Sequence, residues 1–100
     1  MNKKTRANVV WLFDAAYDEI DSEGFVTKGA SSPFEGPCGV GDALIRVAQR
    51  SGRIPFLRAA MGLVEDVTGM EFWRWDKRQT DEVRVLEFLE RMADTYRGKR

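Results

Sequence analysis

A glycine-rich stretch stands directly before a predicted helix, the place where phosphate groups bind in many nucleotide-binding proteins. It runs Gly36-Pro37-Cys38-Gly39-Val40-Gly41-Asp42. The stretch lacks the lysine and the Ser/Thr of a P-loop, and no predicted strand leads into it as in dinucleotide-binding folds. We therefore interpret its glycines as permitting a tight turn and a close approach between helices. Ligand binding is the alternative that the sequence leaves open.

Cys38, within this stretch, is the only cysteine of the chain. A helix N-terminus can lower the pKa of a thiol, but a nucleophilic cysteine also needs a basic partner. The sequence contains no histidine, and neither Lys nor Arg adjoins Cys38. We predict a small buried thiol without a catalytic role.

Composition excludes several further kinds of chemistry. Without histidine there is no Ser-His-Asp or Cys-His catalytic system and no histidine metal ligand, and one cysteine excludes intrachain disulfides and multi-cysteine metal sites. The sequence thus predicts a protein that is not an enzyme and holds no cofactor or metal. Sixteen basic and sixteen acidic side chains give zero net charge, which argues against nucleic-acid binding by bulk attraction.

Charged residues are segregated along the chain. The first predicted helix has an acidic stripe at helical spacing, made of Asp14, Asp18 and Asp21, and an arginine face follows at Arg46, Arg50 and Arg53. We place Arg46 and Arg50 on the outer face of the second helix and predict that the two groups meet, within one chain or across a twofold dimer. The alternatives are that the acids bind a cation or a basic partner and that the arginines contact phosphates.

Trp11 lies away from the apolar face of its helix, whereas Phe13 and Ile20 lie on it. Tryptophan is enriched at the centres of protein interfaces, so one interpretation places Trp11 inside a dimer interface. The other interpretation is that the loop Phe25–Pro37 covers the ring with Phe25 or Phe34.

The segment Phe72–Arg78 interleaves aromatic and basic residues, including Trp73 and Trp75, as single-strand binding proteins do. We favour a structural role in which these rings close one end of a helical bundle. Asp76 and Thr80 are predicted to cap the last helix.

Apolar periodicity predicts four amphipathic helices and therefore an all-α single domain spanning residues 1–100, with residues 1–4 and 97–100 frayed. The helices are expected at about Thr5–Glu23, from Pro37 to Gly52, from Pro55 to Thr68, and from Thr80 or Asp81 to Tyr96. A long loop follows the first helix. The aromatic connection before the last helix, Met70–Trp75, suits a short strand.

Each predicted helix has a core face. The predicted core residues are Val9, Val10, Phe13, Ala16, Tyr17 and Ile20; Val40, Ala43, Leu44, Val47 and Ala48; Phe56, Leu57, Ala60, Met61, Leu63, Val64 and Val67; and Val85, Leu86, Phe88, Leu89, Met92, Ala93 and Tyr96.

No stretch is long and apolar enough for a membrane span or a secretory signal. With one unpaired thiol, a reducing cytoplasm is the expected compartment.

The run Trp75–Val83, followed by Leu86, Leu89 and Ala93, resembles an uncharacterised family of small actinobacterial and actinophage proteins with a Trp-Asn-Asp-like element before a final helix. Gly24–Gly29 is similar to the Gly-Trp-x-x-Gly segment of that family, with Phe for Trp and one extra residue. Cys38–Leu44 is similar to its Cys-x-x-Gly-Ala-Leu helix start, with Asp42 inserted. The resemblance carries over no activity or catalytic residue and implies a small intracellular protein encoded by phages or their hosts.

Three functional hypotheses follow, of which the third, a small-molecule enzyme, rests only on the Gly36–Gly41 turn and Cys38. The first is a non-catalytic protein-interaction module, a phage accessory protein that binds a host protein or a second copy of itself, located in the host cytoplasm. The second is a small nucleic-acid-binding protein that uses Arg46, Arg50 and Arg53 together with the segment Trp73–Arg78.

Overall fold

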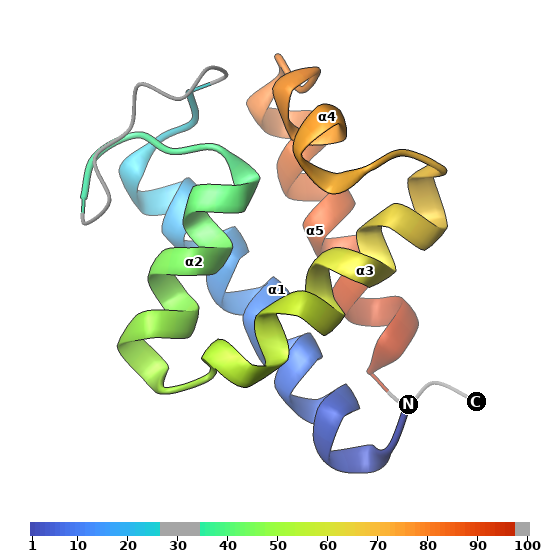
Figure 1. The fold of residues 1–100 in the computed structure, drawn as a ribbon. Helices are drawn as coiled ribbons and strands as arrows, with labels where there is room; N and C mark the ends of the chain where they lie inside the picture. Colours follow the sequence, from blue (N-terminus) through green and yellow to red (C-terminus); the bar gives the residue numbers. More distant parts are fainter. Residues whose placement is uncertain (27–34, 98–100) are drawn as a thin grey trace.

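Helix α1 (Lys3–Glu23) runs through the middle of the molecule, and the second, third and last α-helices pack against it (Figure 1). The computed structural model describes residues 1–26 and 35–97. α1 begins two residues before the predicted start because the side chain of Asn2 accepts a hydrogen bond from the Thr5 N–H at 2.8 Å. It ends at Gly24, whose positive φ of 97° suits glycine.

In the rest of the described chain, four further α-helices and one short 3-10 helix follow. They are α2 (Val40–Ser51), η1 (Ile54–Phe56), α3 (Leu57–Thr68), α4 (Phe72–Lys77) and α5 (Glu82–Tyr96). α1 makes its most extensive contacts with α5 and then with α2. The all-α prediction is confirmed, and within the described residues no helix is long and apolar enough to cross a membrane.

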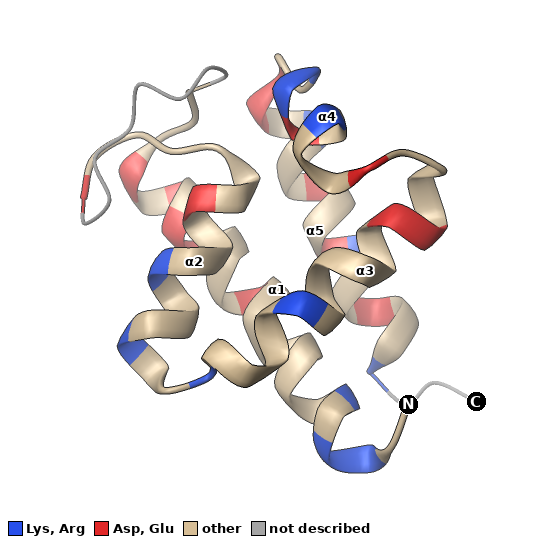
Figure 2. Ribbon diagram, in the orientation of Figure 1, with Lys and Arg blue, Asp and Glu red and all other residues tan. Residues whose placement is uncertain are grey.

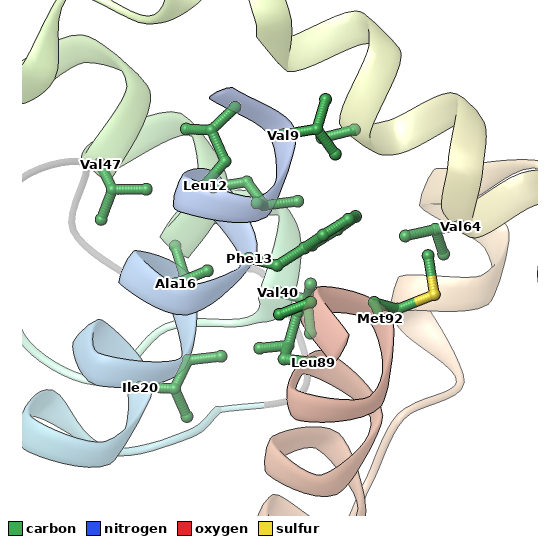
Figure 3. Close-up of a cluster of buried hydrophobic side chains, with 14 of the residues drawn as sticks. Val9, Leu12, Phe13, Ala16, Ile20, Val40, Val47, Val64, Leu89 and Met92 are labelled. Carbon is green, nitrogen blue, oxygen red and sulfur yellow. The ribbon is translucent and has the colours of Figure 1, made fainter. Parts of the chain in front are cut away.

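The core surrounds Phe13, which is fully buried among side chains from α1, α2, α3 and α5 (Figure 3). The five core residues predicted for the second helix are all buried, as is Leu89 of α5. Leu12 is also buried but was not predicted. It is buried because α1 packs against both α5 and α2, so that more than one side of this helix is covered. Val67 is exposed, so its predicted place in the core was wrong. Eight other predicted core residues are only half-buried but pack against the core: Tyr17, Phe56, Leu57, Met61, Leu63, Leu86, Phe88 and Tyr96.

The second helix begins at Val40, three residues after the predicted start at Pro37. The intervening residue Cys38 forms a parallel β-bridge with Phe25 instead. The Cys38 N–H donates to the Gly24 carbonyl at 3.0 Å, and the Val26 N–H donates to the Cys38 carbonyl at 3.3 Å. These bonds hold the two ends of the predicted loop together.

The aromatic connection is a helix, α4, and the prediction of a short strand was wrong. Its N-terminus is capped from two sides, since the Glu71 carboxylate accepts from the Arg74 N–H at 3.0 Å and the Glu65 carboxylate accepts from the Phe72 N–H at 2.8 Å. Helical spacing turns Phe72 and Trp75 inward together, and both are buried. The prediction that these rings close one end of the bundle is confirmed for those two.

Candidate interaction surface

A buried ion cluster joins α1 to α2. Glu19 accepts from Arg46 at 3.1 Å and also from Arg50, whose side chain is largely exposed. Arg46 is only 2% exposed, so its predicted place on the outer face of α2 was wrong. Both arginines pair with Glu19, which lies outside the predicted stripe. Within the described residues the predicted pairing of the acidic stripe with the arginine face was therefore wrong, and a pairing across a dimer stays a prediction.

Arg46 also secures the returning end of the long connection. Its guanidinium donates to the carbonyl groups of Gly36 at 2.8 Å and Glu35 at 3.0 Å. The Gly36 N–H in turn donates to the Glu23 carboxylate at 2.6 Å. A charge buried this deeply is stabilised only when several hydrogen bonds replace its hydration, and the role of Arg46 is therefore structural.

The ion cluster gives the protein a testable acid sensitivity. Burial raises the pKa of Glu19, but the hydrogen bonds from Arg50 and Arg46 outweigh burial and lower the pKa below its ordinary 4.5. Below that value the unfolded chain binds more protons at this position than the folded chain, so stability falls as the pH drops toward the folded-state pKa.

We expect Glu19→Gln to flatten the decline of unfolding free energy at acid pH, measured by urea denaturation at several pH values. The matched control is Asp21→Asn, which removes an exposed carboxylate of the same helix. An acid slope that Glu19→Gln leaves unchanged contradicts the assignment.

The predicted acidic stripe has no common partner. Asp14 forms an ion pair with Arg97 of the chain's C-terminal end at 3.1 Å, while Asp18 and Asp21 are exposed. Figure 2 shows acidic residues on both α1 and α5, the helices that Asp14 and Arg97 connect. Within the described ranges, no group of acidic or cysteine side chains is arranged to hold a metal ion.

Trp11 is 38% exposed, and the guanidinium of Arg53 covers one face of its ring, 3.8 Å from the ring centroid. Arg53 is held there by a 2.9 Å hydrogen bond to the Asn8 side chain. This is a cation–π contact between α1 and the residue that follows Gly52. Phe34, one of the two residues predicted to cover Trp11, lies outside the described residues, and the presence of Trp11 in a dimer interface stays a prediction.

The N-terminus of α2 receives a carboxylate from α4. Asp76 accepts from the N–H groups of Val40 at 3.1 Å and Gly41 at 3.2 Å. The prediction that Asp76 and Thr80 cap the last helix was wrong, since Asp81 caps α5 by accepting from the N–H groups of Val83 and Arg84. Burial raises the pKa of Asp76, and the two backbone hydrogen bonds oppose that rise. An internal carboxylate thus occupies the position where the ligand interpretation of the glycine stretch would place an anion.

Gly41 lets α4 approach α2 closely, as the sequence predicted for these glycines. A Cβ atom at this position would overlap the ring of Trp73. We expect Gly41→Ala to lower the unfolding free energy by about 1–3 kcal/mol, the usual cost of overpacking. In a Trp73→Ala background the same change should cost much less, because the ring is gone. Equal costs in both backgrounds, measured by urea denaturation as a double-mutant cycle, would contradict this contact.

Cys38 is fully buried, as predicted. Burial raises the pKa of its thiol to about 11, so almost none of the reactive thiolate is present at neutral pH. We expect a thiol reagent to label native Cys38 slowly and denatured Cys38 quickly. Rapid labelling of the native protein at neutral pH would show that the thiol is accessible and would revive a catalytic or redox role.

A groove of about 470 Å³ lies between α3 and the start of α4, and we call it the α3–α4 groove. Its apolar lining includes Ile54, Leu57, Met61 and Trp73. Ile54 is 47% exposed and Trp73 is 42% exposed, so large apolar side chains face solvent on both sides. Arg58, Glu65 and Glu71 provide its charged lining.

The structure does not gather the residues proposed for nucleic-acid binding into one surface. Arg46 is buried and Arg50 is paired with Glu19. Trp73 contacts the Gly41 end of α2, while Arg53 follows the opposite end of this 12-residue helix. Trp75 is buried.

Of the residues that line the α3–α4 groove, only Trp73 was among the predicted interaction residues. The sequence assigned Leu57 and Met61 to the core, yet only Ala60 and Val64 of α3 are fully buried. The sequence did offer one indication of an exposed apolar surface. The apolar residues of this helix span a wider arc than contact with the core on one side can bury.

The chain matches no protein-family model, and no curated protein or solved structure is significantly similar to it.

Proposed function

We propose that the protein is a non-catalytic protein-interaction module that binds its partner through the α3–α4 groove. The observation that carries this proposal is that two large apolar side chains of the groove lining, Ile54 and Trp73, are exposed. Met61 also lines the groove, together with charged side chains. An apolar groove with an exposed tryptophan and a charged margin has the composition of a binding hot spot with its polar rim.

Other surfaces favour binding less. The recess beside Trp11 is smaller, about 260 Å³, and Glu19 and Arg50 in its lining already pair with each other. The groove beside Asp14 is lined mainly by polar and charged side chains, and its Arg97 is engaged by Asp14 and Asp94. The groove beside Asp14, at about 440 Å³, is close in volume to the α3–α4 groove, so volume does not separate them. The α3–α4 groove differs in its exposed apolar side chains, Ile54 and Trp73.

The test compares affinity capture by the wild-type chain with capture by a groove variant, Gly62→Lys, with and without nuclease. Gly62 lines the groove, and a Cβ there meets no atom of another part of the chain within 4 Å, so we expect a lysine at this position to occupy the groove and leave the fold intact. The control variant is Arg91→Glu, on an exposed position of α5.

A protein that wild type and Arg91→Glu retain, that Gly62→Lys loses, and that withstands nuclease supports the proposal. Identical capture by all three chains overturns it. Binding abolished by nuclease favours the nucleic-acid hypothesis instead.

A further inference from the structure

We infer that the occupant of the α3–α4 groove is a second copy of this chain, whose α3 lies antiparallel to the first across a twofold axis between Met61 and Gly62. This inference rests on the proposed function and names its partner. It is carried by three features of the exposed face of α3: its charges, its central glycine and the apolar residues beside it.

The charges on this face are self-complementary. Arg58 and Glu65 lie on one stripe of α3 and are equally distant from the point between Met61 and Gly62. In an antiparallel pair of α3 helices, Arg58 of each copy therefore lies opposite Glu65 of the other, giving two equivalent ion pairs about 10 Å apart along the helix. Figure 2 shows the basic residue in the first half of α3 and acidic residues at its end.

Both charged groups are available for such pairing. Arg58 is exposed and has no hydrogen-bond or ion-pair partner among residues 1–26 and 35–97. Glu65 uses Oε2 to accept from the Phe72 N–H, which leaves Oε1 for a partner and fixes the carboxylate in place.

Gly62 allows the two helices to approach closely. It lies inside α3, where glycine costs helix stability relative to alanine, and a Cβ there would contact nothing within 4 Å of the same chain. The space beside Gly62 is therefore not used by the fold. Across the twofold axis, Met61 of one copy faces Gly62 of the other, so a flexible thioether fills the space above the glycine twice.

The self-complementary charges favour a second copy over an unrelated helix. A foreign helix would need an acid and a base at a matching separation in the opposite order, whereas a second α3 supplies both by symmetry. The exposed side chains of Ile54 and Trp73 add apolar area beside the helix pair.

The test measures the mass of the full chain by sedimentation velocity from low micromolar to millimolar concentration. We expect the mass to rise from the 11.4 kDa of one chain toward twice that value. Gly62→Lys should stay at the mass of one chain at every concentration, with a thermal midpoint equal to or above that of the wild type. Arg58→Glu should weaken association by about tenfold or more, because it places like charges opposite each other. Arg91→Glu, the same charge change on α5, should associate like the wild type.

A wild-type chain that remains at the mass of one chain at millimolar concentration overturns the inference, as does a dimer that Gly62→Lys leaves intact. If the chain is monomeric but capture still depends on the groove, the second copy is wrong and the proposed function stands. If the chain is monomeric and capture is independent of the groove, both fail.

Discussion

Replacing Glu19 by alanine is expected to lower the unfolding free energy by about 3–5 kcal/mol, the cost of removing one member of a buried ion pair. The variant removes the carboxylate that Arg46 and Arg50 share. Arg46 is 2% exposed and cannot turn to water without breaking its bonds to the Gly36 and Glu35 carbonyl groups. Urea denaturation at neutral pH measures the change.

Arg50→Ala is the matched control for the same cluster. Its side chain is largely exposed, so its loss should cost about 0–1 kcal/mol, as for a surface ion pair. A Glu19→Ala variant as stable as Arg50→Ala would mean that Arg46 is hydrated in the folded protein, which contradicts its burial.

The second large effect is expected at Leu89, where alanine should cost about 2–5 kcal/mol of unfolding free energy. Leu89 is fully buried against the core around Phe13 (Figure 3). Removing its three terminal carbon atoms loses their burial and leaves a cavity, because α1 and α5 make the most extensive contact between helices and cannot easily close the space.

Val83→Ala in the same helix separates this core effect from helix propensity. Val83 is 62% exposed, so its truncation should change stability by no more than about 0.5 kcal/mol. A thermal melt of Leu89→Ala that matches the wild type would refute the orientation of α5.

The helix pattern and much of the core could be predicted from periodicity alone. The predicted face of the second helix is buried as expected, because α2 packs with one side inward and its apolar residues recur at helical spacing. The burial of Cys38 could likewise be predicted, because a free cysteine behaves as a small apolar side chain and is among the residue types most often buried.

Arrangements that depend on distant parts of the chain could not be predicted. Arg46 has the spacing of an exposed arginine, and its burial follows from Glu19, 27 positions earlier, and from the returning loop. α4 resembles a strand locally, but no strand partner is present within the described ranges and two carboxylates cap it as a helix. The α3–α4 groove escaped prediction because periodicity marks residues as apolar without showing which of them another helix covers.

The capping of α2 by Asp76 has a consequence for the order of folding. The acceptors for the first N–H groups of α2 lie 36 and 35 positions further along the chain, so local interactions alone cannot complete its first turn. α4 depends in return on α2, because Trp73 packs in the space that Gly41 leaves open. Unfolding of either helix leaves the other without its hydrogen-bond partners, either the Asp76 carboxylate or the N–H groups at the start of α2. The two helices are therefore a single cooperative unit in spite of their separation in sequence. A chain synthesised from its N-terminus therefore acquires a complete α2 only after α4 has formed.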